Sequence, residues 1–447
     1  MKLSAIFRRR KTFNHGIHPM EHKALTAGLP VRRLFFAPKM IIPLSQHRGA
    51  PGIPLVKVGQ EVVRGEPIAK AGGFVSVPMH SPVTGVVRSI DELVATAEGP
   101  KARAIIIETY PAATQEVLYQ APIDVDAMTA EELVKAVQAC GMVGLGGAAF
   151  PSHVKLLPPE GKQIDILIIN GCECEPYLTC DHRVMLEQTD CMIRGIRMVI
   201  KATGAKRAII GVEDNKLDAV AHIKTALPTD SEITVEAVVT KYPQGAEKML
   251  ITSLLDKEVP SGGIPADIGV AVYNVGTMAQ LGELIPKSRG LIERVVTVSG
   301  PGAKKPGNYL VPIGTPLRFL MEQVGTTSES TEVIMGGPMM GMSVASQDVA
   351  ITKGVSGVVV FERDERDHPV YPCIKCGACL DACPILLNPS MLGQLAGVRQ
   401  YETMAQEYHL NDCFECGSCS YVCPSNIPLT QYFRIAKAIN REAKTAA

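Results

Sequence analysis

The middle of the chain alternates between helical periodicity and short apolar runs. Residues 128–141, MTAEELVKAVQACG, carry apolar positions three and four residues apart and stop at Gly141, which predicts a helix. IDILIIN, at residues 164–170, is typical of a strand buried on both faces. Helices over 191–202, over 215–226 and from Gly245 are separated by the apolar strands AKRAIIGVE, EITVEAVVT and IGVAVYNV. This βαβ series predicts a mostly parallel, Rossmann-like sheet.

Polar and small residues gather where ligands of such sheets bind, at the carboxyl ends of the strands. The glycine-rich segment GMVGLGGAAFPSHVK, residues 141–155, leaves backbone N–H groups bare at Gly144, Gly146 and Gly147. Bare N–H groups suit a phosphate or a flat ring, and Lys155 adds a positive charge. A tight turn without a ligand explains these glycines equally well.

Two more segments follow predicted strands directly. The acidic segment NGCECEPYLTCDHR, residues 170–183, places Asn170, Glu173 and Glu175 together at a strand end. These groups suit a ribose or a nicotinamide amide, although a solvated acidic turn is the alternative. The third segment, YNVGT at residues 273–277, puts a polar asparagine beside small residues at another strand end.

Eight of the thirteen cysteines lie in two matching runs. The first cysteine run is PCIKCGACLDACP and the second is DCFECGSCSYVCP, and both have the C-x2-C-x2-C-x3-C-P spacing of bacterial-type ferredoxins. The closely spaced thiolates each reach one iron of a cubane, whereas the fourth ligates the other cluster. We therefore assign one [4Fe-4S] cluster to Cys373, Cys376, Cys379 and Cys423, and the other to Cys413, Cys416, Cys419 and Cys383. Zinc sites also use C-x2-C pairs, but not this third cysteine followed by Cys-Pro.

Composition narrows the class of protein. A chain of 447 residues is too long for one core, so three or four domains are expected. A net charge of +0 gives no support for nucleic-acid binding. We find neither an apolar run long enough to cross a bilayer nor the charge order of a secretory signal, which favours a reducing compartment, the cytoplasm. The cysteines outside the runs are interpreted as small residues in tight sites, with a partial ligand set at Cys172, Cys174 and Cys180 as the alternative.

Four motifs, in the same order, resemble the NADH-binding flavoprotein subunit of respiratory complex I. They are AAFPSHVK, NGCECEP, YPQGAE at residues 242–247, and NVGT. The resemblance implies a cradle for FMN formed by Gly144, Gly146, Lys155, Asn170, Asn274 and Thr277. It implies NADH near Glu173, Glu175 and Glu247, with Gly147, Tyr242 and Gly245 in the same cofactor-binding set. Leu145, Cys172 and Ala246 depart from that family, which has Arg, Asp and Glu there.

Nearly the whole chain resembles the C subunit of the Rnf complex, an ion-translocating ferredoxin:NAD oxidoreductase. HGIHPMEHKALT, residues 15–26, is similar to that family's N-terminal signature, and residues 72–90 resemble a lipoyl-like half-motif. The implied architecture is multidomain α/β. A barrel-sandwich hybrid domain covers 1–125, a Rossmann-like FMN/NADH domain 126–290, a β-grasp (SLBB-like) domain 291–350, and a two-cluster ferredoxin-type helical domain 360–440.

This resemblance implies an NADH-dependent flavin and iron–sulfur oxidoreductase subunit, peripheral on the cytoplasmic face of the bacterial inner membrane. It would exchange electrons between NADH and ferredoxin or flavodoxin through FMN and two [4Fe-4S] clusters. The implied partners are the iron–sulfur B subunit and the membrane subunits of the Rnf complex. Two alternatives stay open: a soluble NADH diaphorase module of a hydrogenase or formate dehydrogenase, and a non-catalytic electron relay or scaffold subunit.

Overall fold

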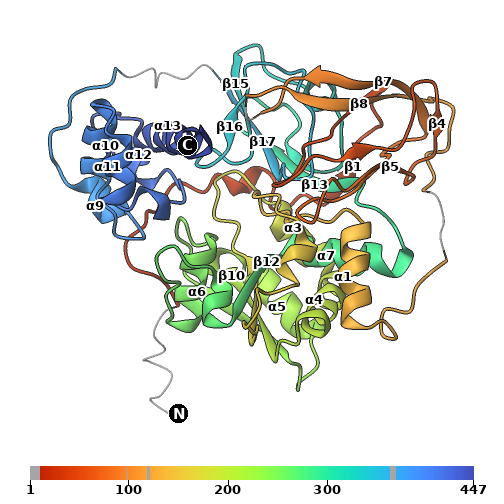
Figure 1. Ribbon diagram of the computed structural model, residues 1–447, viewed down its shortest axis with the longest axis horizontal. Coiled ribbons are helices and arrows are strands. Elements are labelled where there is room, and N and C mark those ends of the chain that lie inside the picture. The colour runs from red at the N-terminus through yellow and green to blue at the C-terminus, as the bar shows by residue number, and fades with distance from the viewer. Residues whose placement is uncertain (1–10, 98, 118–120, 363–368, 447) are drawn as a thin grey trace.

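The computed structural model describes residues 11–97, 99–117, 121–362 and 369–446. Within these ranges the chain forms four sheets and a group of helices near the C-terminus (Figure 1). In Figure 1 the blue C-terminal helices lie at one end, and the orange and red strands of the N-terminal part lie at the other. The yellow and green elements of the middle of the chain lie beneath both.

A parallel four-stranded sheet forms the middle of the chain, in the order β11-β10-β9-β12. Its strands are β9 (Ile166–Gly171), β10 (Arg207–Glu213), β11 (Ile233–Val238) and β12 (Val270–Asn274). Its helices are α1 (Ala130–Ala139), α2 (Ser152–Lys155), α3 (Cys180–Glu187), α4 (Thr189–Thr203), α5 (Leu217–Ala226), α6 (Glu247–Leu255) and α7 (Val275–Leu284). Every helix and strand expected over residues 128–275 is confirmed, and α2, α3 and α7 are additions.

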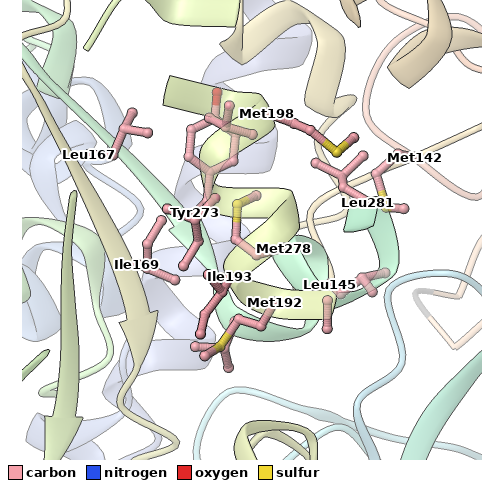
Figure 2. Packing of buried hydrophobic residues seen from close by; sticks show 14 of the residues in the cluster. Met142, Leu145, Leu167, Ile169, Met192, Ile193, Met198, Tyr273, Met278 and Leu281 are labelled. Atoms are coloured by element: carbon pink, nitrogen blue, oxygen red, sulfur yellow. The ribbon is translucent and has the colours of Figure 1, made fainter. Parts of the chain in front are cut away.

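The core of this domain lies between the sheet and helices α4 and α7. Figure 2 shows Leu167 and Ile169 of β9 and Tyr273 of β12 on the side of Ile193 and Met278 from these two helices, and all belong to one buried cluster. The two helices approach closely because glycines meet there. A Cβ added to Gly195 would lie 2.0 Å from the Met278 carbonyl oxygen, and one added to Gly282 would lie 1.9 Å from that of Cys191.

The N-terminal part contributes two small antiparallel sheets. One has the order β2-β8-β7-β4 and the other β3-β5-β6. Their strands are β2 (Lys39–Pro43), β3 (Ile53–Pro54), β4 (Glu61–Val62), β5 (Pro67–Lys70), β6 (Met79–His80), β7 (Gly85–Val94) and β8 (Ala102–Thr109). Side chains from both sheets share one buried cluster that includes Met40, Ile68, Met79 and Ile105, so the two sheets form a single unit.

A mixed sheet gathers strands from distant parts of the chain, in the order β1-β14-β13-β17-β15-β16. They are β1 (Val31–Arg33), β13 (Glu293–Ser299), β14 (Gly307–Pro312), β15 (Ser330–Met335), β16 (Met342–Ser343) and β17 (Gly357–Glu362), with α8 (Leu317–Val324) packed in the same core. β1 and β17 lie outside the range of 291–350 that the sequence predicts for this domain. They join it because β14 and β13 offer them free edges.

The C-terminal part is helical and carries both cysteine runs. Its helices are α9 (Ala378–Ala382), α10 (Pro389–Gly397), α11 (Tyr401–Gln406), α12 (Ser418–Tyr421) and α13 (Leu429–Ala446). Leu392, Met404, Leu429 and Phe433 form its small core.

Residues 12–29 form an extended N-terminal strap across the other domains, red in Figure 1. His15 Nδ1 lies 2.9 Å from the Asp381 carbonyl oxygen beside the first cysteine run. Ile17 pairs with Tyr242 through two backbone hydrogen bonds of 2.8 and 2.9 Å. Further along, Thr26 meets Thr179 and Asn308 in a buried polar network. The strap thus ties the helical domain, the parallel-sheet domain and the mixed sheet together.

Candidate flavin site and cysteine centres

Asn170 and Asn274 stand side by side at the carboxyl edge of the parallel sheet. They are paired in register at the ends of β9 and β12, the adjacent strands between which the connections reverse direction. Such a switch point is where open α/β sheets bind ligands. Asn170 donates to the Gly245 carbonyl oxygen at 2.7 Å and accepts from the Cys172 N–H at 3.0 Å. It therefore joins the acidic segment to the YPQGAE motif.

Asn274 caps helix α7 and sits beneath the glycine-rich segment. Its Oδ1 accepts from the N–H groups of Gly276 and Thr277 at 2.8 and 3.2 Å. Thr277 Oγ1 in turn accepts from the Leu145 N–H at 2.9 Å. A Cβ added to Gly146 would lie 3.3 Å from the Asn274 Cβ. The start of α7 thus fixes the loop directly over the switch point.

The backbone of this loop is open where the resemblance implies a flavin. Gly146, Gly147 and Ala148 are exposed. The N–H of Gly144, expected to be bare, instead donates to the Phe150 carbonyl oxygen at 2.8 Å, because the loop folds back on itself there. Gly147 has a φ of +112°, and a Cβ added there would meet nothing within 4 Å. Because this backbone is bare and faces free space, its N–H groups can approach a ring or a phosphate closely. The residues present fit a flat anionic group such as FMN.

Lys155 supplies the positive charge of this site. Its Nζ lies 3.1 Å from Glu247 Oε2 and donates to the Val272 carbonyl oxygen at 3.1 Å. It also lies 5.9 Å from the centre of the Tyr273 ring. Lys155 and Glu247 are about one-third exposed, at 37% and 38% of their side-chain surface, so the pair contributes little stability and can reorganise around an anion.

The two glutamates of the acidic segment have separate partners. Glu173 is buried and caps α3, accepting from the N–H groups of Asp181 and His182 at 3.0 and 3.3 Å. Glu175 reaches the mixed sheet and accepts from the N–H groups of Met339 and Met340 at 3.0 and 2.8 Å. Burial raises the pKa of Glu175 to about 7. In this arrangement both carboxylates organise backbone, and their contact with NADH stays a prediction.

The strap holds the acidic segment by its carbonyl groups. Lys23 Nζ donates to the carbonyl oxygens of Glu173, Glu175 and Leu178 at 2.7, 2.8 and 2.6 Å. Burial lowers the pKa of Lys23, with Glu173 opposing that shift. The resemblance to the Rnf family singled out the segment that contains Lys23, but gave this residue no role.

Two charged residues at the site were not predicted. Asp181 accepts from Asn274 Nδ2 at 2.6 Å, and burial followed by the charge of Glu173 raises the pKa of Asp181. Arg294, which is 3% exposed, donates to the Leu145 carbonyl oxygen at 3.1 Å. Together they line a small pocket beside Gly276. Asp181 lies in the acidic segment and could have been noticed there. Arg294 lies in β13 of the mixed sheet, where no sequence motif of the flavin domain points to it.

The two cysteine runs lie side by side and exchange their fourth members. Cys383 of the first run lines one pocket with Cys413, Cys416 and Cys419 of the second. Cys423 of the second run is a neighbour of Cys379, whose pKa is raised mainly by burial and further by this nearby thiol. Gly377 and Gly417, at φ values of +83° and +82°, open the two short helices in equivalent left-handed conformations.

The cysteine spacing fits cubane clusters better than zinc, because zinc sites use C-x2-C pairs without a third cysteine at the same short interval followed by Cys-Pro. The thiols of Cys172, Cys174 and Cys180 point to different partners, namely the Gly211 carbonyl oxygen, the Gly245 N–H and Glu173. This supports their interpretation as small residues in a tight site.

A comparison with characterised proteins decides the family. The chain is 42% identical over 389 residues to the C subunit of the proton-translocating ferredoxin:NAD(+) oxidoreductase complex of Clostridium ljungdahlii, covering 86% of this chain and 84% of that protein. The chain belongs to this family of Rnf C subunits. It is also 41% identical over 383 residues to the C subunit of the Na(+)-translocating complex of Acetobacterium woodii, covering 85% and 86%. The C subunit of the ion-translocating oxidoreductase complex of Haemophilus influenzae strain 86-028NP is 39% identical over 429 residues, which is 95% of this chain and 64% of that protein.

Domain families match this Rnf C subunit along most of its length. They are an RnfC barrel sandwich hybrid domain at residues 11–110, a Nuo51 FMN-binding domain at 137–283, an SLBB domain at 295–343 and a 4Fe-4S dicluster domain at 369–427. The chain is therefore an electron-transfer subunit with flavin and iron–sulfur domains. A solved NAD+-reducing [NiFe]-hydrogenase in its H2-reduced state is similar at 18% identity and a TM-score of 0.47, over 74% of this chain and 67% of that one. None of the described helices is long and apolar enough to span a bilayer.

Proposed function

We propose that this chain is the peripheral electron-entry or electron-exit subunit of a membrane-bound ion-translocating oxidoreductase. It exchanges electrons between NADH and ferredoxin or flavodoxin through FMN and two [4Fe-4S] clusters. The observation that carries the proposal is the combination, in one chain, of an open glycine backbone over a switch point and two sets of four thiols. When bound, FMN supplies the exchange between hydride and single-electron transfer, and the clusters carry single electrons.

The residues at the switch point have distinct tasks in this proposal. Asn170 and Asn274 set the edge of the site, and Thr277 holds the glycine-rich loop above it. Gly146 and Gly147 offer their backbone to the ring and phosphate, Gly144 shapes the loop through its bond to Phe150, and Lys155 neutralises the phosphate charge. Glu247 is released from Lys155 as the anion binds and contacts NADH, and Glu173 and Glu175 shape the nucleotide side through the backbone that they hold.

The burial of the two runs suggests an order of electron transfer. Cys383 and Cys419 are buried, whereas Cys373 and Cys376 of the first run are exposed. Tyr242 and Gly245 lie between the switch point and the second run. We infer that electrons pass between the flavin and the cluster at Cys413, Cys416, Cys419 and Cys383, and then leave or enter at the first run. The exposed first run faces the partners in the complex, the iron–sulfur B subunit and the membrane subunits, on the cytoplasmic side of the membrane.

The deciding experiment is an anaerobic titration of the flavin- and iron-replete chain with NADH, followed by visible absorbance and EPR. Bleaching of the flavin followed by reduction of two interacting clusters is expected. If the protein retains its flavin and its clusters are reduced by dithionite but not by NADH, the chain is a relay or scaffold and not the site of electron entry.

A pair of glycine variants locates the flavin. Gly146→Val places a branched side chain against Asn274 in the open loop, and the variant is expected to lose FMN. Gly28→Val is the control, because a Cβ at this exposed glycine meets nothing within 4 Å. Equal FMN content in the two variants would place the flavin elsewhere.

A further inference from the structure

Tyr242 joins the parallel-sheet domain to the second cysteine run. Its side chain is 1% exposed, and its hydroxyl donates to the carbonyl oxygen of Cys416 at 2.6 Å. The resemblance to complex I implied a role for this residue near flavin or nucleotide, whereas the structure directs its hydroxyl to a cluster loop.

The backbone of Tyr242 is fixed independently of that hydroxyl. Both its N–H and its carbonyl group pair with Ile17 of the strap. Ile17, Tyr242 and Ala382 form one apolar cluster, against which Cys174, Met339 and Cys416 pack. The ring therefore has a single setting, and the hydroxyl has a fixed direction.

Other groups seat the same run on the rest of the protein. Asp412 accepts from Ser261 Oγ at 2.5 Å and from the Gly262 N–H at 3.1 Å. Gly417 lies so close to the Met339 carbonyl oxygen that an added Cβ would be 2.9 Å from it. The second run is thus docked at several points, and at Tyr242 the contact is made directly to a cysteine of the run, Cys416.

The two runs have the same cysteine spacing, yet their surroundings differ. Residues 372–376 of the first run are exposed throughout, whereas Gly417, Ser418 and Cys419 of the second are buried. Net charge, hydrogen bonds and solvent exposure are among the means by which a protein sets the potential of an iron–sulfur cluster. The runs differ in charge at Lys375 and Glu415, and the docking of the second run adds a further difference in hydrogen bonding and exposure.

We propose that Tyr242 is a positioning residue that raises the reduction potential of the second-run cluster. The positive end of its phenolic O–H dipole is directed at the carbonyl oxygen of Cys416. This dipole stabilises the extra electron on the cluster that Cys416 ligates. The inference rests on the proposed function only for the identity of the cluster. It goes beyond that function because it predicts that the Tyr242 hydroxyl raises the reduction potential of one cluster and not of the other.

The test is a redox titration with dithionite, followed by EPR, of Tyr242→Phe in the full chain loaded with clusters. A typical hydrogen bond contributes about 1 kcal/mol, so its loss is expected to weaken reduction of the second-run cluster about fivefold. For a one-electron couple this lowers the potential by about 40 mV. The first-run cluster should not shift. A Cys373→Ser variant, which lacks the first-run cluster, assigns the signals.

The matched control is Tyr421→Phe, which removes an exposed hydroxyl from the second run itself. Unchanged potentials in Tyr242→Phe, or equal shifts of both clusters, would overturn the proposal. If Tyr242→Phe does not retain its iron, 3-fluorotyrosine at position 242 is used, because it keeps the hydroxyl and strengthens it as a donor. The potential of the second-run cluster should then rise, and no change would refute the role. NADH is absent from these titrations, so their outcome is independent of whether NADH is the electron donor.

Discussion

Replacement of Lys23 by methionine tests how the strap holds the acidic segment. Methionine keeps the apolar stem but removes the ammonium that donates to the carbonyl oxygens of Glu173, Glu175 and Leu178. Hydrogen bonds from a charged donor contribute roughly 1.5–3 kcal/mol each. Burial of the ammonium lowers its pKa, and this desolvation offsets several kcal/mol of the free energy that the hydrogen bonds contribute. We expect a net loss of about 3 kcal/mol in the free energy that keeps this segment closed.

Hydrogen exchange measured by mass spectrometry reads that free energy directly. The Tyr177 N–H donates to Glu21 of the strap, and the Asp181 N–H donates to Glu173, so both are protected in the closed segment. A loss of about 3 kcal/mol makes opening, and hence exchange, roughly 100-fold faster in peptides covering residues 171–182. Lys57→Met, at an exposed lysine, is the control and should leave exchange unchanged. If Lys23→Met exchanged no faster than this control, the strap would not stabilise the segment.

Three further predictions concern a buried lysine, the cap of α7 and the cysteine that the first run contributes to the second cluster. Burial lowers the pKa of Lys353 from 10.5 to about 7, so between pH 7 and 10 the unfolded chain binds more protons than the folded chain. The free energy of unfolding should therefore rise with pH over this range, by up to roughly 5 kcal/mol. Urea unfolding of Lys353→Met should lack this pH dependence, and a variant that kept it would contradict the assignment to Lys353. Asn274→Ala removes the cap of α7, at a cost of about 1 kcal/mol, and should raise the Kd for FMN measured by fluorescence. The control is Asn388→Ala, which removes the cap of α10 in the helical domain and should leave this Kd unchanged. Cys383→Ala should lose about half of the iron and expose the thiols of the second run to alkylation, as mapped by mass spectrometry. Alkylation confined to the first run would show that the runs do not exchange their fourth ligand.

The local chemistry and much of the flavin domain can be predicted from the sequence. The cysteine spacing is set by the size of an iron–sulfur cubane, which is smaller than any domain, so it is readable within about twelve residues. The helices and strands over residues 128–275 were predicted because each buries one pattern of apolar positions against a single sheet. Asn170 and Asn274 follow such strands, and the sheet brings them together because parallel strands end at the same edge.

The contacts between the domains could not be predicted from the sequence. The mixed sheet takes in β1 and β17 because free strand edges accept any chain segment of the right geometry, whatever its position in the sequence. Lys23 and Tyr242 contact backbone carbonyl groups, which every residue has, so no pattern of side chains could reveal their partners. For the same reason two cysteine runs with the same spacing have different exposure. Their spacing is local, but the surfaces that cover one run and leave the other open come from residues far away in the sequence.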